Sequence, residues 1–182
     1  MLTAARPGCA RAYPGEPPAV AFEGPLAVAP QGVAAGTIPR RIWSYWNTQT
    51  PDAVVEQCIA NWRTQCPGYE IHVLNGANLS RHVPPRDLPE GFAQLHPTKQ
   101  SDWLRLYLVR HHGGYWLDAT TLLTQPLDWL DAARRARGAE FVGFFLQGFT
   151  HDARYPVVES WAFGAPAQSP FVAAWQRNST AR

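Results

Sequence analysis

The sequence is poor in charge and nearly devoid of lysine. Charged residues make up 16% of the 182 residues, Lys99 is the single lysine, and the formal net charge is +2. Such a balance gives no electrostatic reason to expect a nucleic-acid partner. No stretch approaches the roughly 20 consecutive apolar residues of a membrane-spanning helix, and none near Met1 resembles a signal peptide. We therefore expect a cytoplasmic protein.

Cysteine is scarce as well, with three residues, Cys9, Cys58 and Cys66. Cys58 and Cys66 lie within one segment of helical periodicity, which separates them by roughly 12 Å at the rise of an α-helix. That distance exceeds the reach of a disulfide bond. The sequence therefore predicts no disulfide framework and fits a reducing compartment.

Apolar residues, in contrast, are plentiful. They make up 46% of the chain, which is a globular composition, and 182 residues suffice for one domain with a sizeable core. Residues 1–37 differ from the rest, because they are rich in Pro, Ala and Gly and show no hydrophobic period. We predict a flexible tail over residues 1–37 and a folded domain over residues 38–182.

Strand and helix patterns alternate along the folded part. In chain order, the periodicities predict strand 40–46, helix 51–66, strand 69–75, helix 98–112, strand 115–123, helix 126–137, strands 141–149 and 157–166, and a last helix from 169. The first strand, helix and strand form a βαβ unit, whose strands should be parallel. The pattern is typical of an α/β fold.

Three residues are expected to mark helix ends. Pro51 suits the first turn of the helix at 51–66. Thr98 is expected to cap the next helix at its N-terminus, and Gly113 to cap it at its C-terminus.

The first candidate for a site is the strand end "SYWN". Ligands of open α/β sheets bind outside the carboxyl ends of the strands. There Trp46 could stack on a nucleobase, although an aromatic residue in such a strand is more often part of the core. Asn47 could bond a base edge or simply form a turn.

The second candidate is the helix "KQSDWLRLYL", in which Lys99, Asp102 and Arg105 recur every three residues and share one face. Either these residues pair with one another at a solvated edge, or they point into a cleft. In a cleft, Asp102 could accept hydrogen bonds from ribose hydroxyls, and Arg105 could bind a phosphate.

The third candidate is "GGYWLDAT", where Asp118 interrupts an apolar run. A buried carboxylate is costly unless it is paired or holds a metal. If the strand continues, Asp118 and Thr120 share one face with Trp116 before them, and two oxygen donors could address one Mg²⁺ or Mn²⁺ ion. The double glycine ending in Gly114 would let a ligand approach the chain closely.

Other polar groups have simpler explanations. His111 and His112 end a helix, where the dipole favours them, and adjacent helical residues diverge in direction. Glu159 could face an acceptor as a base or stabiliser, or could lie at a solvated strand end.

Three segments in this order, "IPRRIWSYWN", "KQSDWLRLYLVRHHGGYWLDATTLLTQPL" and "ESWAFGAPAQSPFVAAW", resemble the capsular polysaccharide synthesis protein family. The resemblance covers about residues 38–176. That family is similar to the wider group of DXD-containing sugar transferases related to family 32. The middle segment is the most specific, because it combines a Ser-Asp-x-x-Arg helix, a Gly-Gly and a short acidic motif at fixed spacing.

The resemblance implies a GT-A-like, Rossmann-type nucleotide-diphospho-sugar transferase fold. It implies a nucleoside-diphosphate sugar donor, a glycan or polysaccharide acceptor, and Mn²⁺ or Mg²⁺ as cofactor, with retention of the anomeric configuration favoured. Peripheral association with membrane assembly machinery at the inner membrane face is left open. The site implied by motif and resemblance comprises Asp118 and Arg105 in catalysis, Asp118 and Thr120 at the metal, and Trp46, Asn47, Lys99, Asp102, Arg105 and Gly114 at the donor.

Two departures from the family pattern matter. Thr120 stands where the wider group has the second Asp of its motif, so we expect weak metal binding until a diphosphate is present. Family members are usually longer, so we expect a C-terminally truncated domain. A non-catalytic sugar-nucleotide-binding module and a nucleotide-free scaffold therefore remain the alternatives to a glycosyltransferase.

Overall fold

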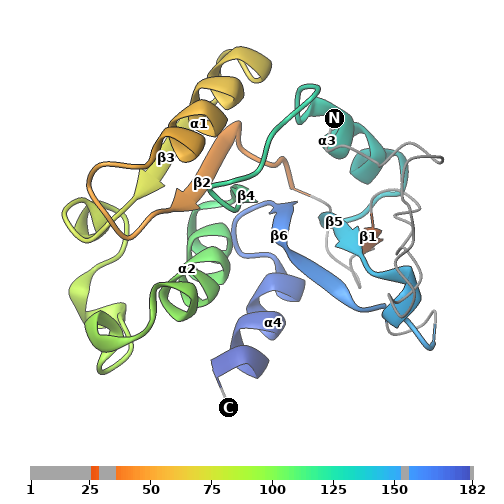
Figure 1. The fold of residues 1–182 in the computed structure, drawn as a ribbon. Coiled ribbons are helices and arrows are strands. Elements are labelled where there is room, and N and C mark those ends of the chain that lie inside the picture. The colour runs from red at the N-terminus through yellow and green to blue at the C-terminus, as the bar shows by residue number, and fades with distance from the viewer. Residues whose placement is uncertain (1–25, 29–35, 153–155, 181–182) are drawn as a thin grey trace, which may run out of the picture.

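The computed structural model of the protein describes residues 26–28, 36–152 and 156–180. They form an α/β fold with a six-stranded sheet in the order β1-β5-β6-β4-β2-β3 (Figure 1). The predicted α/β class is thus confirmed, and the mixed sheet is compatible with a Rossmann-like fold. Most of the predicted tail and Cys9 lie outside the described residues. Within that tail, however, β1 (Leu26–Val28) pairs antiparallel with β5, so these three residues are a strand and not a tail.

One half of the sheet is parallel. β2 (Arg41–Tyr45) lies between β3 (Glu70–Leu74) and β4 (Gly114–Leu117) and pairs parallel with both. α1 (Ala53–Gln65) connects β2 to β3. The predicted βαβ unit is confirmed.

The other half is antiparallel. β6 (Val158–Ala165) pairs antiparallel with β4 and with β5 (Phe141–Phe145). β5 is shorter than the predicted strand, because a 3₁₀ turn forms at Gln147–Phe149. The β5–β6 pairing shifts register between Gly143 and Phe145, so extra residues of β6 bulge out of that pairing.

Helices cover both faces of the sheet (Figure 1). α1 and α3 (Asp128–Ala136) pack on one face, and α2 (Pro97–His112) and α4 (Pro170–Thr180) on the other. Side chains of β4 alternate between the two cores, as a strand requires. All four residues of β4 are buried, so this strand is the centre of the domain.

α1 owes its position to one apolar stripe. Val55, Cys58, Ile59 and Trp62 recur at helical spacing and are buried against the sheet. Asp52 is the N-cap, since its side chain accepts from the Val55 N–H at 3.0 Å. Pro51, predicted in the first turn, therefore precedes the helix, because Asp52 offers the better cap. Cys58 and Cys66 are free thiols, as predicted.

The N-cap of α2 lies two residues before the predicted cap, Thr98. Three 3₁₀ turns, Leu79–Arg81, Pro85–Asp87 and Phe92–Gln94, lead from β3 to His96. His96 Nδ1 accepts from the Thr98 N–H at 3.3 Å, so His96 and not Thr98 is the N-cap. Pro97 then takes the first helical position, which its fixed φ suits.

The C-terminal end of α2 is the predicted glycine. Gly113 has φ of 66°, a conformation that L side chains rarely adopt. A Cβ at this position would lie 2.7 Å from the Ala167 nitrogen. The glycine therefore both ends α2 and lets two segments pack closely.

β4 is shorter than predicted, and Asp118 lies just past its end. The Asp118 N–H still donates to the Trp161 carbonyl at 2.8 Å, but its own carbonyl accepts from the Thr121 N–H at 2.9 Å, which forms a turn. The expectation that Asp118 and Thr120 share one strand face is therefore wrong. Asp favours the first position of such turns, and that preference outweighs the apolar run around it.

Candidate functional site

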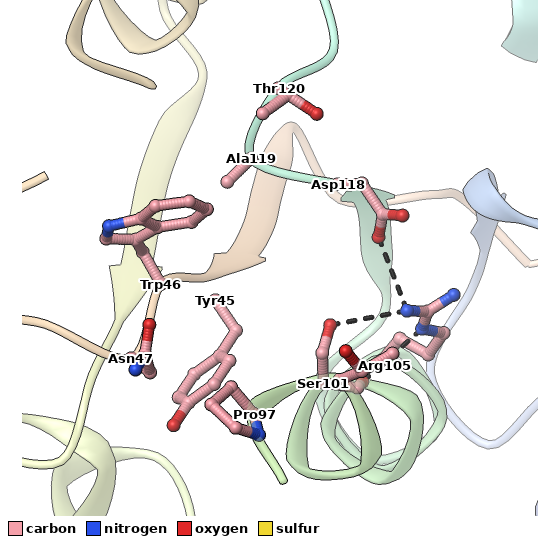
Figure 2. A pocket seen from close by; sticks show the side chains of 10 residues that line it. Tyr45, Trp46, Asn47, Pro97, Ser101, Arg105, Asp118, Ala119 and Thr120 are labelled. Carbon is pink, nitrogen blue, oxygen red and sulfur yellow. Dashed lines mark hydrogen bonds and ion pairs between the residues drawn. The ribbon is translucent and has the colours of Figure 1, made fainter. Parts of the chain in front are cut away.

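A pocket of about 220 Å³ opens at the carboxyl ends of β2 and β4, beside the first turns of α2 (Figure 2). Ligands of open α/β sheets bind at this end of the strands. The residues that line the pocket come from three segments: Tyr45, Trp46, Asn47, Pro97, Thr98, Ser101, Arg105, Asp118, Ala119 and Thr120. Five predicted site residues are among them: Trp46, Asn47, Arg105, Asp118 and Thr120.

The wall formed by the end of β2 is aromatic. Trp46 is half-buried and packs against the core under α1, yet it also lines the pocket, across from Asp118 and Arg105 in Figure 2. Tyr45 is held firmly, because its hydroxyl donates to Oε1 of Gln100 at 2.5 Å. Burial raises the pKa of Tyr45, which keeps that hydroxyl protonated. This wall is a fixed surface.

Arg105 is the cationic centre of the opposite wall. Its side chain is only 7% exposed, and its Nη2 lies 3.1 Å from Asp102 Oδ1 and 3.4 Å from Asp118 Oδ1. Nη1 donates to the Ser160 hydroxyl, and Nε and Nη2 reach the backbone oxygen and hydroxyl of Ser101 at 3.3 Å. α2 thus supplies a buried charge whose orientation is fixed by neighbours on two other elements.

Asp118 carries the carboxylate that faces the pocket. Its side chain is 37% exposed, and the buried Trp116 donates its indole N–H to Oδ1 at 2.7 Å. Burial raises the pKa of Asp118; the Arg105 charge and the Trp116 hydrogen bond oppose that rise, and the Asp102 charge adds to it. A carboxylate whose ionised form is destabilised in this way gains from any further cation that binds beside it.

Glu159 adds negative charge near this wall. It is half-buried in β6, in the part of the strand that bulges away from β5. Burial raises the pKa of Glu159, and the Asp118 charge raises it further. Glu159 is therefore close enough to Asp118 to interact with it electrostatically, although it does not line the pocket.

The remaining members of the predicted charged stripe on α2 pair with each other. Lys99 Nζ lies 3.9 Å from Asp102 Oδ2, and the Lys99 side chain is 74% exposed. Asp102 lies between Lys99 and Arg105 and forms an ion pair with each. Both alternatives for this stripe therefore hold in part, because the three residues form salt bridges with one another and Arg105 also lines the pocket. Donor contacts of Lys99 and Asp102 stay predictions.

Gly114 lies at the far end of β4 from Asp118 and does not line the pocket. It has φ of 107°, and a Cβ there would meet the Arg41 carbonyl oxygen at 2.7 Å and the Trp43 Nε1 at 3.3 Å. The double glycine thus permits close approach between strands. The expectation that Gly114 admits a ligand has no support from this pocket and stays a prediction.

The loop after Asp118 is tied to α1. The Asn61 side-chain amide donates to the Leu123 carbonyl at 2.9 Å, and its oxygen accepts from the Leu123 N–H at 2.8 Å. The next residue of α1, Trp62, donates its indole N–H to the Thr121 carbonyl at 2.7 Å. Thr120 lies at the exposed rim of this anchored loop.

The donor set suits a cation that arrives with its own ligands. Asp118 is the single carboxylate among the pocket-lining residues, and Thr120 adds a hydroxyl. Among residues 26–28, 36–152 and 156–180, no three His, Cys, Asp or Glu side chains are grouped to hold a metal. Mg²⁺ is typically bound through one or two carboxylates, with phosphate oxygens and waters completing its shell. Asp118 and Thr120 therefore fit a cation bound with a diphosphate and not one held by the protein alone.

Several residues of the site were not predicted as such. Tyr45 and Ser101 line the pocket, Trp116 binds Asp118, and Ser160 binds Arg105. Ser101 is one helical turn before Arg105, so helical spacing could have indicated it. Ser160 is far away in sequence, and no local pattern connects it with Arg105.

The histidines at the end of α2 do not line the pocket. His111 stacks on Tyr107 with ring centroids 4.2 Å apart. His112 Nε2 lies 3.0 Å from the His82 carbonyl oxygen. Both contacts are structural, in line with the simpler explanation.

The mixed sheet, with a charged pocket at the carboxyl ends of its parallel strands, defines an α/β protein and is compatible with a Rossmann-like fold. Residues 31–180, most of the chain, match the capsular polysaccharide synthesis protein family, so the protein belongs to that family. None of the curated proteins compared with the chain matches it. In the part of the chain that the structure describes, no helix combines the length and apolar character needed to cross a membrane.

Proposed function

We propose that the protein is a glycosyltransferase with a GT-A-type fold, which transfers a sugar from a nucleoside-diphosphate donor to a glycan or polysaccharide acceptor. One observation carries the proposal: Asp118 and Arg105 lie 3.4 Å apart on one wall of a pocket whose other wall is Trp46. A flat aromatic surface, a fixed cation and a pocket-facing carboxylate are the groups that a base, a diphosphate and its metal require. Membership in the capsular polysaccharide synthesis protein family supports a role in polysaccharide assembly.

The donor is proposed to lie across the pocket from Trp46 to Asp118. Trp46 stacks on the base, and the exposed Asn47 bonds its edge. Arg105, held by Ser101 and Ser160, places positive charge next to the diphosphate, and the N-terminal turn of α2 adds to this potential. Asp102, whose side chain is 45% exposed, accepts from hydroxyls of the ribose or sugar. The pocket of about 220 Å³ is smaller than the ~300–1,000 Å³ usual for ligand sites, so part of the donor extends beyond it.

Asp118 and Thr120 are proposed to hold Mn²⁺ or Mg²⁺ together with the diphosphate oxygens. When bound, the metal supplies charge that stabilises the leaving diphosphate. Arg105 provides fixed positive charge at the same place without any need to reorganise during the reaction. The cytoplasmic location expected from the sequence stays a prediction.

A non-catalytic sugar-nucleotide-binding module is the second candidate. Thr120 favours it, because a neutral hydroxyl is a weaker metal ligand than the carboxylate of a second Asp. The two candidates differ in turnover and not in donor binding, so one assay of each kind separates them.

A thermal-shift screen of nucleoside-diphosphate sugars, with and without Mn²⁺, tests the proposal. We expect one donor to raise the Tm by about 5–10 °C at a hundredfold excess over its Kd, with Mn²⁺ required for most of the shift. Asp118→Asn should lose the Mn²⁺-dependent part and lower sugar transfer by about 100-fold or more, because it removes the negative charge and replaces one carboxylate oxygen with an NH₂ group that cannot bind a cation. Asp128→Asn is the matched control, since Asp128 is an exposed acid paired with Arg40 away from the pocket.

The outcomes are distinct. Binding of a donor without transfer to any acceptor would favour the non-catalytic module. No shift with any donor, in the presence or absence of Mn²⁺, would refute nucleotide-sugar binding and leave a scaffold role. Unchanged transfer by Asp118→Asn would refute the metal role of Asp118.

A further inference from the structure

Two tryptophans lie side by side in the parallel half of the sheet. Trp43 on β2 pairs in register with Trp116 on β4, and both belong to the core under α2. Their side chains are equally buried, at 1% and 0% exposure. A buried indole N–H usually has a hydrogen-bond partner, because an unpaired one is costly. The two indole N–H groups have different hydrogen-bond partners.

The two indoles donate toward opposite ends of the strands. Trp43 Nε1 donates to the Gly113 carbonyl at 2.8 Å, at the amino end of β4. Trp116 Nε1 donates to Asp118 Oδ1 at 2.7 Å, at its carboxyl end. Only the second hydrogen bond ends on a side chain that lines the pocket.

The Trp116 hydrogen bond selects one oxygen of Asp118. Oδ1 receives the indole N–H at 2.7 Å and lies 3.4 Å from Arg105 Nη2, while the Asp118 backbone N–H is fixed on the Trp161 carbonyl. Among the described residues, no hydrogen bond to Oδ2 is present. The guanidinium of Arg105 also lies over the Trp116 ring, 5.5 Å from its centroid. The indole therefore contacts both charged groups, and Oδ2 of Asp118 accepts no hydrogen bond from the described residues.

Core packing alone does not explain this choice of residue. A phenylalanine could fill much of the same buried space, but it could not hold a carboxylate in one orientation. Partners that orient a metal-binding carboxylate typically contribute 10- to 100-fold to metal affinity. The Trp116 indole N–H, which donates to Oδ1 of Asp118, can orient that carboxylate in this way.

We propose that Trp116 is a positioning residue, which holds Oδ1 of Asp118 and leaves Oδ2 free to bind the cation that accompanies the donor diphosphate. The inference rests on the proposed function, because it assigns a task to that site. Trp116 touches neither donor nor metal and acts only through Asp118.

The test compares Trp116→Phe with Trp43→Phe. Each variant removes one buried indole N–H from the same core, so both should lower the Tm to a similar extent. Binding of Mn²⁺ is measured by electron paramagnetic resonance in the presence of uridine, guanosine or cytidine diphosphate, each in turn. We expect Trp116→Phe to weaken Mn²⁺ binding by about 10- to 100-fold and Trp43→Phe by no more than about twofold.

Equal Mn²⁺ affinity of the two variants would overturn the positioning role and leave the proposed function intact. Absence of Mn²⁺ binding by the wild-type protein with every nucleotide would overturn both.

A second measurement needs no Trp116 variant. ¹H–¹⁵N spectra of the Asp118→Asn variant are compared with those of the wild-type protein. One indole N–H signal should shift, and it should not be the signal that disappears in Trp43→Phe. Mn²⁺ with the nucleotide should broaden the same signal that Asp118→Asn moves. If no indole N–H signal changes its chemical shift in Asp118→Asn, the inference is overturned, even if Trp116→Phe does not fold.

Discussion

The two ends of β2 and β4 carry similar residues and differ in what surrounds them. At the amino end, the Arg41 guanidinium lies 5.4 Å from the Trp43 ring centroid, and its Nε bonds Glu70 Oε2 at 2.8 Å. At the carboxyl end, Arg105 lies over Trp116 and pairs with Asp118. Each end thus combines a tryptophan, an arginine and a carboxylate.

The pKa values separate the two carboxylates. Hydrogen bonds from Arg41 and His72 lower the pKa of Glu70, so its ionised form is well stabilised. Burial raises the pKa of Asp118 despite Arg105. An arginine–carboxylate pair over a tryptophan therefore does not define a site by itself. The distinguishing features are a pocket and a carboxylate whose charge is only partly compensated.

Packing separates the two ends as well. At the amino end, the rings of His72, His82 and His112 surround Trp43 at centroid distances of 4.6, 5.0 and 5.3 Å. Gly114 lets Arg41 approach there, because a Cβ at position 114 would lie 2.7 Å from the Arg41 carbonyl oxygen. The amino end holds the strands together, and the carboxyl end presents groups to the pocket.

The largest effect is expected from Gly114→Ala, which breaks the packing of the amino end. The new Cβ would lie 2.7 Å from the Arg41 carbonyl oxygen in a backbone with φ of 107°. We expect the free energy of unfolding to fall by more than about 3 kcal/mol, measured by urea denaturation. Gly76→Ala is the control, because a Cβ there meets nothing within 4 Å. A mild loss at Gly114 would contradict its structural role.

A smaller effect is expected when each arginine is replaced by lysine. Arg105→Lys keeps the charge but loses hydrogen bonds to Ser101 and Ser160 in a buried position, which should cost about 1–3 kcal/mol. Arg41→Lys should cost less than about 1 kcal/mol, because its partner Glu70 is 60% exposed. Chemical denaturation of the two variants gives the comparison. Equal losses would mean that the two arginines are equally structural.

The smallest effect concerns pH, and its sign differs between the two ends. Burial lowers the pKa of His82, aided by the charges of His72, His112, Arg41 and Arg81. The folded protein thus binds that proton less readily than the unfolded chain, whose His pKa is about 6.5, so stability should fall as the pH drops below that value. Asp118 has a raised pKa, so its contribution is favourable at low pH and is lost as the pH rises through its pKa in the folded state.

Urea midpoints between pH 8 and about pH 3.5, a range that includes the ordinary pKa values of both His and Asp, measure this difference. His82→Phe keeps a ring against Trp43 and should flatten the decline toward acid pH. Asp118→Asn removes an opposing contribution and should make the acid decline steeper. A steeper acid decline in His82→Phe than in Asp118→Asn would contradict the opposite signs expected for the amino and carboxyl ends.

The order of elements could be predicted from periodicity, because buried stripes such as that of α1 leave a clear pattern. Their ends could not. Pro51 and Thr98 are plausible helix starts, but Asp52 and His96 provide the caps, and only side-chain geometry decides between such neighbours.

The charged core of the site could be predicted in part. Trp46, Asn47, Arg105, Asp118 and Thr120 do line one pocket, although Asp118 follows β4 where the sequence suggested a longer strand. The role of Gly114 could not be predicted, because a glycine with a positive φ is needed at a close approach whether the neighbour is a ligand or, as here, the Arg41 backbone of another strand. The pairing of Arg105 with Ser160 depends on the β6 bulge, which no local pattern reveals.

The hydrogen bonds from Asn61 and Trp62 to the loop after Asp118 have a consequence for ligand entry. Three hydrogen bonds of 2.7–2.9 Å attach this loop to α1, a helix of thirteen residues. The loop therefore cannot close over the pocket as a lid unless these hydrogen bonds break. The rim at Thr120 is preformed, and little entropy is lost in ordering it when a molecule docks. If the donor binds as proposed, the rim selects it by a rigid shape, and we expect substitutions of Asn61 or Trp62 to alter that selectivity.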